Sequence, residues 1–341
     1  MRIKDLVIPP TTVTILTTYQ CTAACRNCCS QCNPSIKERL TFEKMKGYLD
    51  MCLKAYPNSI KVFVLTGGEC FLLGNDLVKI IEYANSKGLV VRVVTNGYWA
   101  QTYEKAYEKL KELTDKGLRE INFSTGDDHQ EWVKYDNVIN GSIAAADLGL
   151  TCVINVETHD NASFNNNVFL KDKRILPYLQ KDSSEKKRIR IINGVWVPFL
   201  KETNVSYDKT IIGIPKERCT GLLNAININP YSSVLACCGL FNERILPLRL
   251  GNLSLKGSDL KQIYEDQFSD FIKIWLFVDG PYKILEWVYE KCNIKKEIPN
   301  GHICMQCATL FKEPQNIETI QLYLDEILSS VLLKYRLFFK H

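Results

Sequence analysis

The sequence predicts an α/β protein with two parts, an incomplete barrel of six βα units and a smaller module that is rich in cysteine. Two observations lead to this prediction. Through the first 195 residues, short apolar runs rich in β-branched residues alternate with segments of helical periodicity, which is the pattern of a parallel sheet. After residue 200 this alternation stops and cysteines become frequent. We therefore assign a TIM-like partial (β/α)6 barrel to residues 1–200 and the second module to residues 201–341.

Six strands and five helices make up the predicted barrel. Strands are expected where β-branched residues concentrate, and helices where apolar residues recur at helical spacing with Lys and Glu on the other face. The predicted strands are residues 13–17, 62–66, 90–95, 121–124, 152–156 and 188–192. The predicted helices are residues 41–56, 75–87, 102–116, 131–149 and 165–180. Because such barrels carry their chemistry at the carboxyl ends of the strands, the residues that follow each strand are the candidate site.

The second module is predicted to combine short strands with helices. Strand-like pieces lie at residues 225–229 and 233–238. Helical stretches lie at residues 258–277, 282–293 and 317–338. Residues 181–187, before this module, are polar and highly charged, and we expect them to form a solvated loop.

Composition and charge restrict the class of protein. Of the 341 residues, 46% are hydrophobic and 24% charged, close to the globular average, which excludes a disordered or collagen-like chain. No apolar run approaches the ~18 residues of a membrane span, and the N-terminus has no signal-peptide core. The net charge of +5, an excess that residues 171–190 alone supply, is small for a nucleic-acid-binding protein. We expect a cytoplasmic protein with neither a nucleic-acid nor a membrane partner.

Most of the 14 cysteines fall in two clusters, which in a reducing compartment indicates metal binding rather than disulfides. The first cluster follows the first strand and consists of Cys21, Cys25, Cys28, Cys29 and Cys32. Thiolates spaced as in Cys21-x3-Cys25-x2-Cys28 can hold three irons of a [4Fe–4S] cluster, and the fourth iron then stays open for another ligand. A zinc site that uses four of the five thiols is the alternative.

The next strand also ends in residues of chemical interest, Gly67, Gly68 and Glu69. The glycines allow close backbone approach, and the carboxylate suits an ammonium group held near the open iron. Residues 127–129, Asp-Asp-His, follow the fourth strand. They either orient a bound substrate or cap the helix that is predicted to begin near Glu131.

The cysteine loop and the Gly-Gly-Glu strand end resemble motifs of the radical S-adenosylmethionine (SAM) superfamily over about residues 11–195. The matching residues are Cys21, Cys25, Cys28, Gly67, Gly68 and Glu69. The resemblance implies that SAM binds the open iron and that one electron cleaves it to methionine and a 5′-deoxyadenosyl radical. It also implies that Asn96 and Ser124 bind the ribose and methionine parts of SAM. One departure is Asn27, at a position that is often aromatic in the superfamily and covers the adenine.

The second cysteine cluster contains a four-thiolate set. Its members are Cys219, Cys237, Cys304 and Cys307, and Cys292 is an alternative member. A fully ligated [4Fe–4S] cluster at such a set serves electron transfer or structure, and a structural zinc ion is the other interpretation. The pattern resembles the auxiliary-cluster module known as SPASM or twitch, and the number of ligands favours the twitch form.

Cys238 directly follows one of these four cysteines. If Cys237 binds the cluster at the end of a strand, its neighbour points to the opposite side, so the Cys238 thiol faces another space. An S–H bond is weak enough to give a hydrogen atom to a carbon radical. A small cysteine buried in the core, or an alternative ligand, is the other interpretation.

Taken in order, the motifs resemble those of radical SAM peptide epimerases of the YydG (EpeE) type. They are the first cysteine cluster, Gly67-Gly68-Glu69, Asn96-Gly97-Tyr98-Trp99, Asp127-Asp128-His129, Ala236-Cys237-Cys238-Gly239 and Cys304-x2-Cys307. The resemblance implies that the radical removes a Cα hydrogen from an L-residue of a ribosomal precursor peptide. Cys238 then returns hydrogen from the opposite face, and a reducing partner such as flavodoxin or ferredoxin supplies electrons.

Two other functions remain open at this point. One is a radical SAM enzyme that crosslinks or oxidises a peptide and uses the auxiliary cluster as electron acceptor. The other is a zinc-bearing interaction protein. We expect Cys29 and Cys32 to be packing thiols, and we regard Trp99, Trp132 and residues 171–190 as candidate peptide contacts.

Overall fold

The computed structural model describes residues 6–179, 188–196, 214–240 and 242–339, and it divides into two compact units. The barrel unit comprises Thr12–Ser206 with Ile228–Pro230. The second unit comprises Met1–Thr11, Tyr207–Asn227 and Tyr231–His341. The predicted boundary at residue 200 and the predicted loop 181–187 lie outside the described residues.

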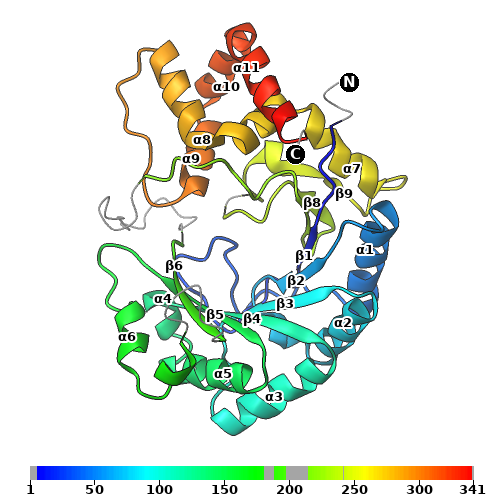
Figure 1. The fold of residues 1–341 in the computed structure, drawn as a ribbon, viewed down its shortest axis with the longest axis vertical. Coiled ribbons are helices and arrows are strands. Elements are labelled where there is room, and N and C mark those ends of the chain that lie inside the picture. The colour runs from blue at the N-terminus through cyan, green and yellow to red at the C-terminus, as the bar shows by residue number, and fades with distance from the viewer. Residues whose placement is uncertain (1–5, 180–187, 197–213, 241, 340–341) are drawn as a thin grey trace. The chain divides into compact units, whose positions relative to one another are not determined.

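The barrel unit is built on six parallel strands that follow one another in chain order (Figure 1). They are β1 (Thr12–Leu16), β2 (Val62–Thr66), β3 (Val90–Thr95), β4 (Leu118–Thr125), β5 (Thr151–Glu157) and β6 (Ile189–Gly194). Each strand pairs in parallel with the next. The predicted α/β class and the partial (β/α)6 barrel are therefore confirmed, and all six predicted strands are present.

One row of apolar side chains crosses all six strands. Its members are register neighbours with no exposed surface: Ile15, Leu65, Val93, Ile121, Cys152 and Ile189. Because side chains alternate between the two faces of a strand, such a row places a continuous apolar layer on one face. Cys152 is thereby a core residue, and so is Cys52 in the first helix, which is also fully buried.

Helices cover the outer side of these strands (Figure 1). The main ones are α1 (Phe42–Ala55), α2 (Asn75–Ser86), α3 (Tyr103–Asp115) and α5 (Tyr135–Asp147). Thr41 and Thr102 cap α1 and α3, since their hydroxyls accept hydrogen bonds from the N–H groups three residues later. Four shorter pieces are η2 (Cys70–Leu73), α4 (Asp127–Gln130), α6 (Asn166–Lys171) and η3 (Leu176–Tyr178).

Two helix predictions in this unit are wrong in extent. The helix predicted over 165–180 ends at Lys171, because the extended backbone of Asp172 lets its carboxylate accept from the Arg174 N–H at 2.9 Å. The helix predicted over 131–149 begins only at Tyr135. Residues 127–129 belong to the preceding short helix α4, so they do not cap the longer one.

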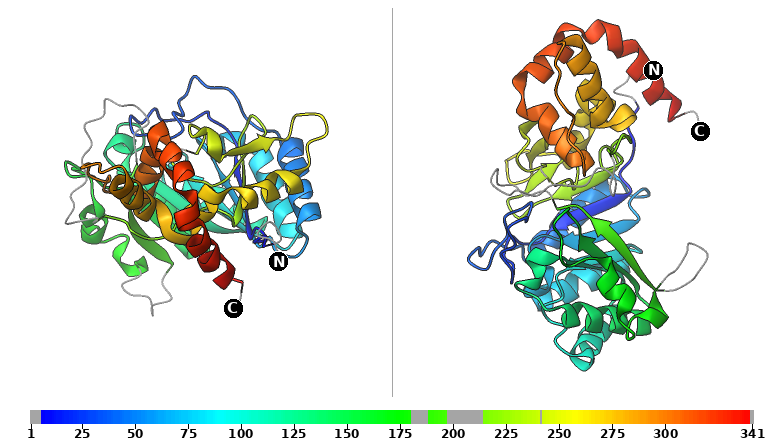
Figure 2. Two further views of the ribbon diagram at one scale, coloured as in Figure 1. Left: turned by 90° about the horizontal axis from the view of Figure 1, so that it is seen from above. Right: turned by 90° about the vertical axis from the view of Figure 1, so that its left-hand side faces the viewer.

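The second unit contains most of β7 (Ala225–Ile228), an antiparallel pair of β8 (Ser233–Leu235) and β9 (Arg249–Asn252), and several helices. The helical pieces are η4 (Leu246–Leu248), α7 (Leu260–Asp266), η5 (Gln267–Ser269), α8 (Phe271–Lys291), α9 (Ile303–Lys312), α10 (Pro314–Leu322) and α11 (Leu324–Leu337). Helices α8 to α11, orange to red in Figure 2, form one group. The predicted strand 233–238 stops at Leu235, and neither β9 nor α9 was predicted.

Helix α8 is sharply kinked within this unit. Gly280 has a positive φ of 79° and Pro281 follows it, at the break between two predicted helices. The chain start belongs to the same unit: the Tyr335 hydroxyl donates to the Leu6 carbonyl at 2.6 Å, and the Tyr264 hydroxyl donates to the Ile8 carbonyl at 2.9 Å. Within the described ranges, every helix is too short or too polar to cross a lipid bilayer.

Candidate functional site

The first cysteine loop leaves β1 and lies directly against the end of β2. The Gly68 N–H donates to the Thr18 carbonyl at 2.6 Å, and the Glu69 N–H donates to the Gln20 carbonyl at 2.9 Å. A Cβ on Gly67 would stand 2.4 Å from the Thr18 oxygen, and one on Gly68 would stand 2.1 Å from the Gln20 oxygen. Both glycines are therefore required for the loop to approach the strand end.

The thiols of this loop line a pocket of about 180 Å³ at the carboxyl ends of the barrel strands. Its walls come from the loop, from the ends of β2 to β5 and from the segment after β6. The lining includes seven of the residues predicted for this site: Cys21, Cys25, Cys28, Gly67, Gly68, Asn96 and Ser124. Asn96 also contacts the loop, since its Nδ2 donates to Thr22 Oγ1 at 2.9 Å.

Glu69, the remaining predicted residue, lies behind the pocket wall with no exposed surface. Its carboxylate accepts hydrogen bonds from Thr95 Oγ1 at 2.9 Å, from the Asn96 N–H at 2.8 Å and from the Phe71 N–H at 3.0 Å. Burial raises the pKa of Glu69 to about 7. In this arrangement the carboxylate joins the ends of β2 and β3.

The three thiols differ in their electrostatic surroundings. Burial raises the pKa of Cys21 to about 11 and also raises the pKa of Cys25. A hydrogen bond from the Cys32 thiol lowers the pKa of Cys28 to about 6. The Cys32 N–H adds a second hydrogen bond to Cys28 Sγ at 3.4 Å. The thiolate is the metal-binding form of cysteine, and the hydrogen bond from the Cys32 N–H favours that form at Cys28.

The three thiols of the loop line one pocket. Over the described ranges, no three His, Cys, Asp or Glu side chains come together closely enough to hold one metal ion. In an iron–sulfur cluster, by contrast, the thiolates sit on separate irons of a larger group. Thiols spread over the wall of one pocket fit a cluster of that kind.

Asp128, in α4, holds the cysteine loop in place. Its Oδ2 accepts from the Asn27 N–H at 2.8 Å, and its Oδ1 accepts from Arg26 Nε and Nη2 at 3.1 and 2.9 Å. The Asn27 side chain in turn donates to Glu157 Oε1 at 2.6 Å. Two carboxylates therefore fix the segment between the second and third cysteines of the loop.

Three residues that line the pocket were missed by the sequence analysis as ligand-binding candidates: Glu157, Trp196 and, in part, His129. Glu157 is the last residue of β5, and burial raises its pKa to about 7. The rule that singled out the other strand ends also applies to it. The His129 ring lies 5.4 Å from that of Trp196, its Nδ1 has no hydrogen-bond partner among the described residues, and burial lowers its pKa to about 4.

Asp127 faces away from this pocket. Its carboxylate accepts from the Ser163 N–H and hydroxyl at 2.9 and 2.7 Å and from the Phe164 N–H at 2.8 Å. It therefore orders the loop that follows β5.

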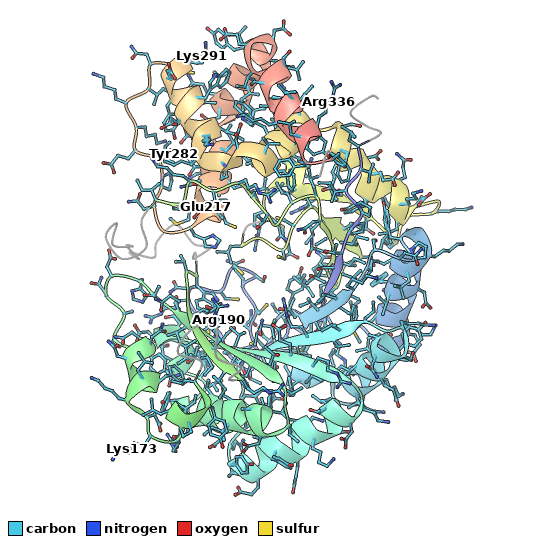
Figure 3. All side chains as sticks on the ribbon, viewed as in Figure 1. Lys173, Arg190, Glu217, Tyr282, Lys291 and Arg336 are labelled. Carbon is cyan, nitrogen blue, oxygen red and sulfur yellow. The ribbon has the colours of Figure 1, made fainter. Side chains whose placement is uncertain are left out.

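The second cysteine set lines a separate cavity of about 670 Å³, which lies wholly in the second unit. All four predicted thiols contribute to it: Cys219, Cys237, Cys304 and Cys307. The rest of the wall is largely apolar, with Glu217 (labelled in Figure 3) and His302 among the polar members. Burial raises the pKa of Cys219, Cys237 and Cys307.

Two glycines leave space beside these sulfurs. A Cβ on Gly239 would stand 3.2 Å from both Cys237 Sγ and Cys304 Sγ, so the two sulfurs are at most twice that distance apart. A Cβ on Gly221 would stand 4.0 Å from Cys219 Sγ. The Gly239 N–H also donates to Cys237 Sγ at 3.4 Å. These contacts form a cradle around the thiols that fits an inorganic cluster.

Cys238 lines the same cavity but is exposed, whereas Cys237 is buried. The interpretation of Cys238 as a core residue is therefore wrong. The reason given for its orientation is also wrong, because β8 ends at Leu235 and the two cysteines follow it in a loop.

The remaining thiols occupy other surroundings. Cys292 contacts Thr319 Oγ1 at 3.0 Å and is not part of the cavity wall. Cys29 and Cys32 both line the barrel pocket, and Cys32 is buried beside Cys28.

Some of the candidate peptide contacts have structural partners, and among the described residues others do not. Trp99 stacks on Phe71 with ring centroids 4.4 Å apart, while Trp132 is 47% exposed. In the basic stretch, Arg174 pairs with Asp136 at 2.9 Å, and Lys173 projects away from the strands (Figure 3). Residues 180–187 of this stretch lie outside the described residues.

Fold and pocket together define a partial (β/α)6 barrel with a three-cysteine loop at the carboxyl end of its first strand. No family model matches the chain. The chain is 25% identical over 129 residues to the "Putative peptide biosynthesis protein YydG" of Bacillus subtilis (strain 168), which covers 38% of this chain and 40% of that protein. It is 29% identical over 143 residues to the "GTP 3′,8-cyclase" of Campylobacter fetus subsp. fetus. This match covers 39% of this chain and 41% of that protein. The matches span about two fifths of the length of either relative.

Two solved structures are also similar to this one. BtrN in complex with AdoMet and 2-DOIA is 14% identical with a TM-score of 0.48, over 81% of this chain and 91% of that chain. The native anSMEcpe with bound AdoMet is 15% identical with a TM-score of 0.48, over 94% of this chain and 99% of that chain.

Proposed function

We propose that this protein is a radical SAM epimerase that converts L-residues of a ribosomally made peptide to D-residues. The observation that carries the proposal is the pair Cys237 and Cys238, one thiol buried among three others and the next exposed at the same cavity. The similarity to a relative named as a putative peptide biosynthesis protein supports a peptide as the substrate.

In this proposal the barrel pocket binds the first [4Fe–4S] cluster and SAM. Cys21, Cys25 and Cys28 hold the cluster, and Gly67, Gly68, Asn96 and Ser124 bind SAM at the pocket wall. Glu69, behind the wall, supports the SAM site by accepting a hydrogen bond from the Asn96 N–H. SAM bound at such a cluster supplies a carbon-centred radical that removes one hydrogen atom from a substrate carbon. The chain itself fixes the geometry, since Asp128 and Glu157 hold the loop between the second and third thiols.

The cavity of the second unit binds the other [4Fe–4S] cluster through Cys219, Cys237, Cys304 and Cys307. The glycine cradle and the largely apolar wall favour a group that is fully enclosed by thiolates. Four thiols complete such a ligand set, so Cys238 is not needed as a ligand.

Cys238 is the proposed hydrogen donor. Its S–H bond breaks homolytically and the hydrogen joins the Cα radical on the face opposite to the one from which hydrogen was taken. The sulfur radical then takes up one electron and one proton from the reducing system, which restores the thiol. The peptide gains no mass, and its residue changes from the L to the D form. We expect a precursor peptide and a reduced flavodoxin-like or ferredoxin-like protein as partners.

Mass spectrometry of the peptide after reaction in D2O tests the proposal. The anaerobically reconstituted enzyme is given SAM, reductant and the small peptide encoded next to its gene. One deuterium gained at Cα for each modified residue supports epimerisation, because the thiol hydrogen exchanges with solvent. Cys238→Ala should lower deuterium incorporation more than tenfold while SAM cleavage continues. The matched control is Cys292→Ala, which changes a thiol outside the cavity and should leave incorporation unchanged.

The second candidate function is oxidation or crosslinking of the peptide, with the enclosed second cluster as electron acceptor. The cavity lined by the four predicted thiols is the observation that favours it. Loss of two hydrogens without deuterium gain, retained in Cys238→Ala, would establish this function and overturn the epimerase proposal.

A further inference from the structure

His302, a residue outside every motif of the sequence, is the N-cap of α9. Its Nδ1 accepts a hydrogen bond from the Cys304 N–H at 3.1 Å. Two of the four cavity thiols, Cys304 and Cys307, lie in the first two turns of this helix. The cap therefore determines where the helix begins and how both thiols are presented to the cavity.

The same hydrogen bond determines the tautomer of the ring. A nitrogen that accepts from an N–H carries no proton, so in the neutral ring the proton is on Nε2, which is then a donor. His302 lines the cavity together with Cys304 and Cys307. The cavity wall therefore contains an N–H donor as well as five thiols, those of the four proposed ligands and of Cys238.

We propose that His302 is a positioning residue of the auxiliary site that fixes Cys304 and Cys307 through the helix cap and supplies its Nε2–H as a hydrogen-bond donor to the cluster. This inference rests on the proposed function, because it requires a cluster at the four thiols. Hydrogen bonds to the sulfurs of an iron–sulfur cluster help to set its reduction potential, since they stabilise the extra negative charge of the reduced state. The donor should therefore raise the potential of this cluster.

Two substitutions separate the two roles of His302. Asn is among the best N-cap residues, so His302→Asn keeps the cap but removes the imidazole donor. His302→Ala removes both. Asp259→Ala is the matched control, because Asp259 caps α7 in the same unit without lining the cavity.

The experiment measures iron per chain, the electron paramagnetic resonance spectrum and the reduction midpoint potentials of the anaerobic holoenzyme. We expect His302→Ala to lose about half of the bound iron, that of the auxiliary cluster. His302→Asn should retain all of the iron but show a more negative auxiliary midpoint, with the potential of the barrel cluster unchanged. Asp259→Ala should match the wild type in both measurements.

Three outcomes would overturn parts of this inference. An unchanged auxiliary midpoint in His302→Asn would remove the donor role. Full iron content in His302→Ala would remove the positioning role. A wild-type protein that binds only four irons per chain would instead contradict the auxiliary cluster itself, and with it that part of the proposed function.

Discussion

Asp128 holds the first cysteine loop in place through its hydrogen bonds to Arg26 and Asn27. It is 4% exposed, and its two oxygens accept three hydrogen bonds from Arg26 and from the Asn27 N–H. Hydrogen bonds to a charged group contribute roughly 1.5–3 kcal/mol each, so the contribution of this residue is large for one side chain. The loop it holds contains all three proposed ligands of the first cluster.

We predict that Asp128→Ala loses the first cluster. Iron per chain should fall by about half and SAM cleavage should fall more than tenfold, because the segment between the second and third cysteines loses its anchor. Iron analysis and SAM cleavage assays measure both effects. Asp136→Ala, which removes an exposed carboxylate of the same unit, should change neither value. Full iron content in Asp128→Ala would show that the loop keeps its shape without the carboxylate.

His129 makes the stability of the protein depend on pH. Burial lowers its pKa to about 4, whereas the unfolded chain has the ordinary value near 6.5. Between these values the unfolded chain binds a proton that the folded chain does not, so stability is complete above about pH 6.5 and falls as the pH drops towards 4. At about 1.4 kcal/mol for each pKa unit, the loss between pH 7 and pH 5 is about 2 kcal/mol.

A comparison with His129→Gln isolates this effect, because Gln does not titrate. The buried carboxylates Glu69 and Glu157 have raised pKa values and change stability in the opposite direction, but they do so equally in both proteins. We expect the wild type to lose more thermal stability than His129→Gln when the pH is lowered from 7 to 5. Parallel changes in the two melting temperatures would mean that the ring is protonated in the folded protein.

At the level of elements, the kink in α8 positions the first thiol of the second set. Gly280 has a φ of 79°, and a Cβ there would stand 2.0 Å from the Glu217 carbonyl oxygen. Because the helix is broken at this point, the Leu276 carbonyl accepts instead from the Cys219 N–H at 3.0 Å. The kink therefore lets the segment before Cys219 pack closely against the helix, and it frees the Leu276 carbonyl to bind the Cys219 N–H.

We predict that Gly280→Ala lowers auxiliary cluster occupancy severalfold and leaves the barrel cluster loaded. The substitution adds a clash with backbone and the strain of a positive φ in a residue with a side chain. Gly257→Ala is the matched control, since Gly257 has a similar φ of 83° with nothing within 4 Å of its added Cβ. If the two variants bind equal amounts of iron, the kink is not what positions Cys219.

The elements that the sequence predicted best have strong local patterns. The strands Val62–Thr66 and Val90–Thr95 match the predicted ranges, because β-branched residues fill a strand that is buried in a parallel sheet. Helix α9 was not among the predicted helices, and its two cysteines were considered only as ligands of the second set. The break in α8 left a gap between two predicted helices, since Gly280 and Pro281 both interrupt the helical pattern.

Local sequence patterns predict which segments lie near one another, but they do not predict the specific side-chain contacts between those segments. The seven pocket residues lie at strand ends, where the topology of a parallel barrel brings them together. The pairing of Asn27 with Glu157, 130 residues apart, depends on side-chain directions that no local pattern contains. The sequence identified Glu69 as a carboxylate at a strand end. It did not show that this carboxylate is buried behind the pocket wall, because that position depends on hydrogen bonds from Thr95 and Asn96 in the next strand.

At the scale of the whole molecule, each cysteine set belongs to one compact unit. The loop thiols and every residue of their pocket lie in the barrel unit, and the four thiols and their cavity lie in the second unit. Each unit also has its own buried apolar side chains, such as Phe63 and Phe123 in one and Trp275 and Tyr264 in the other. Since neither thiol set takes a ligand from the other unit, each cluster should assemble independently of the other.

We therefore predict that the triple substitution Cys21→Ala, Cys25→Ala and Cys28→Ala removes one cluster and leaves the other intact. The variant should keep about half of the wild-type iron and the spectrum of the auxiliary cluster, and it should lose SAM cleavage completely. Cys52→Ala, which changes a buried thiol of the barrel core, should retain all of the iron. Air exposure gives the complementary result: the barrel cluster, with one iron not bound by the protein, should degrade first, while the enclosed cluster persists in both the wild type and the triple variant. Loss of all iron from the triple variant would mean that the second site needs an intact barrel site to assemble, and the two units would then have to be treated as one folding and loading system.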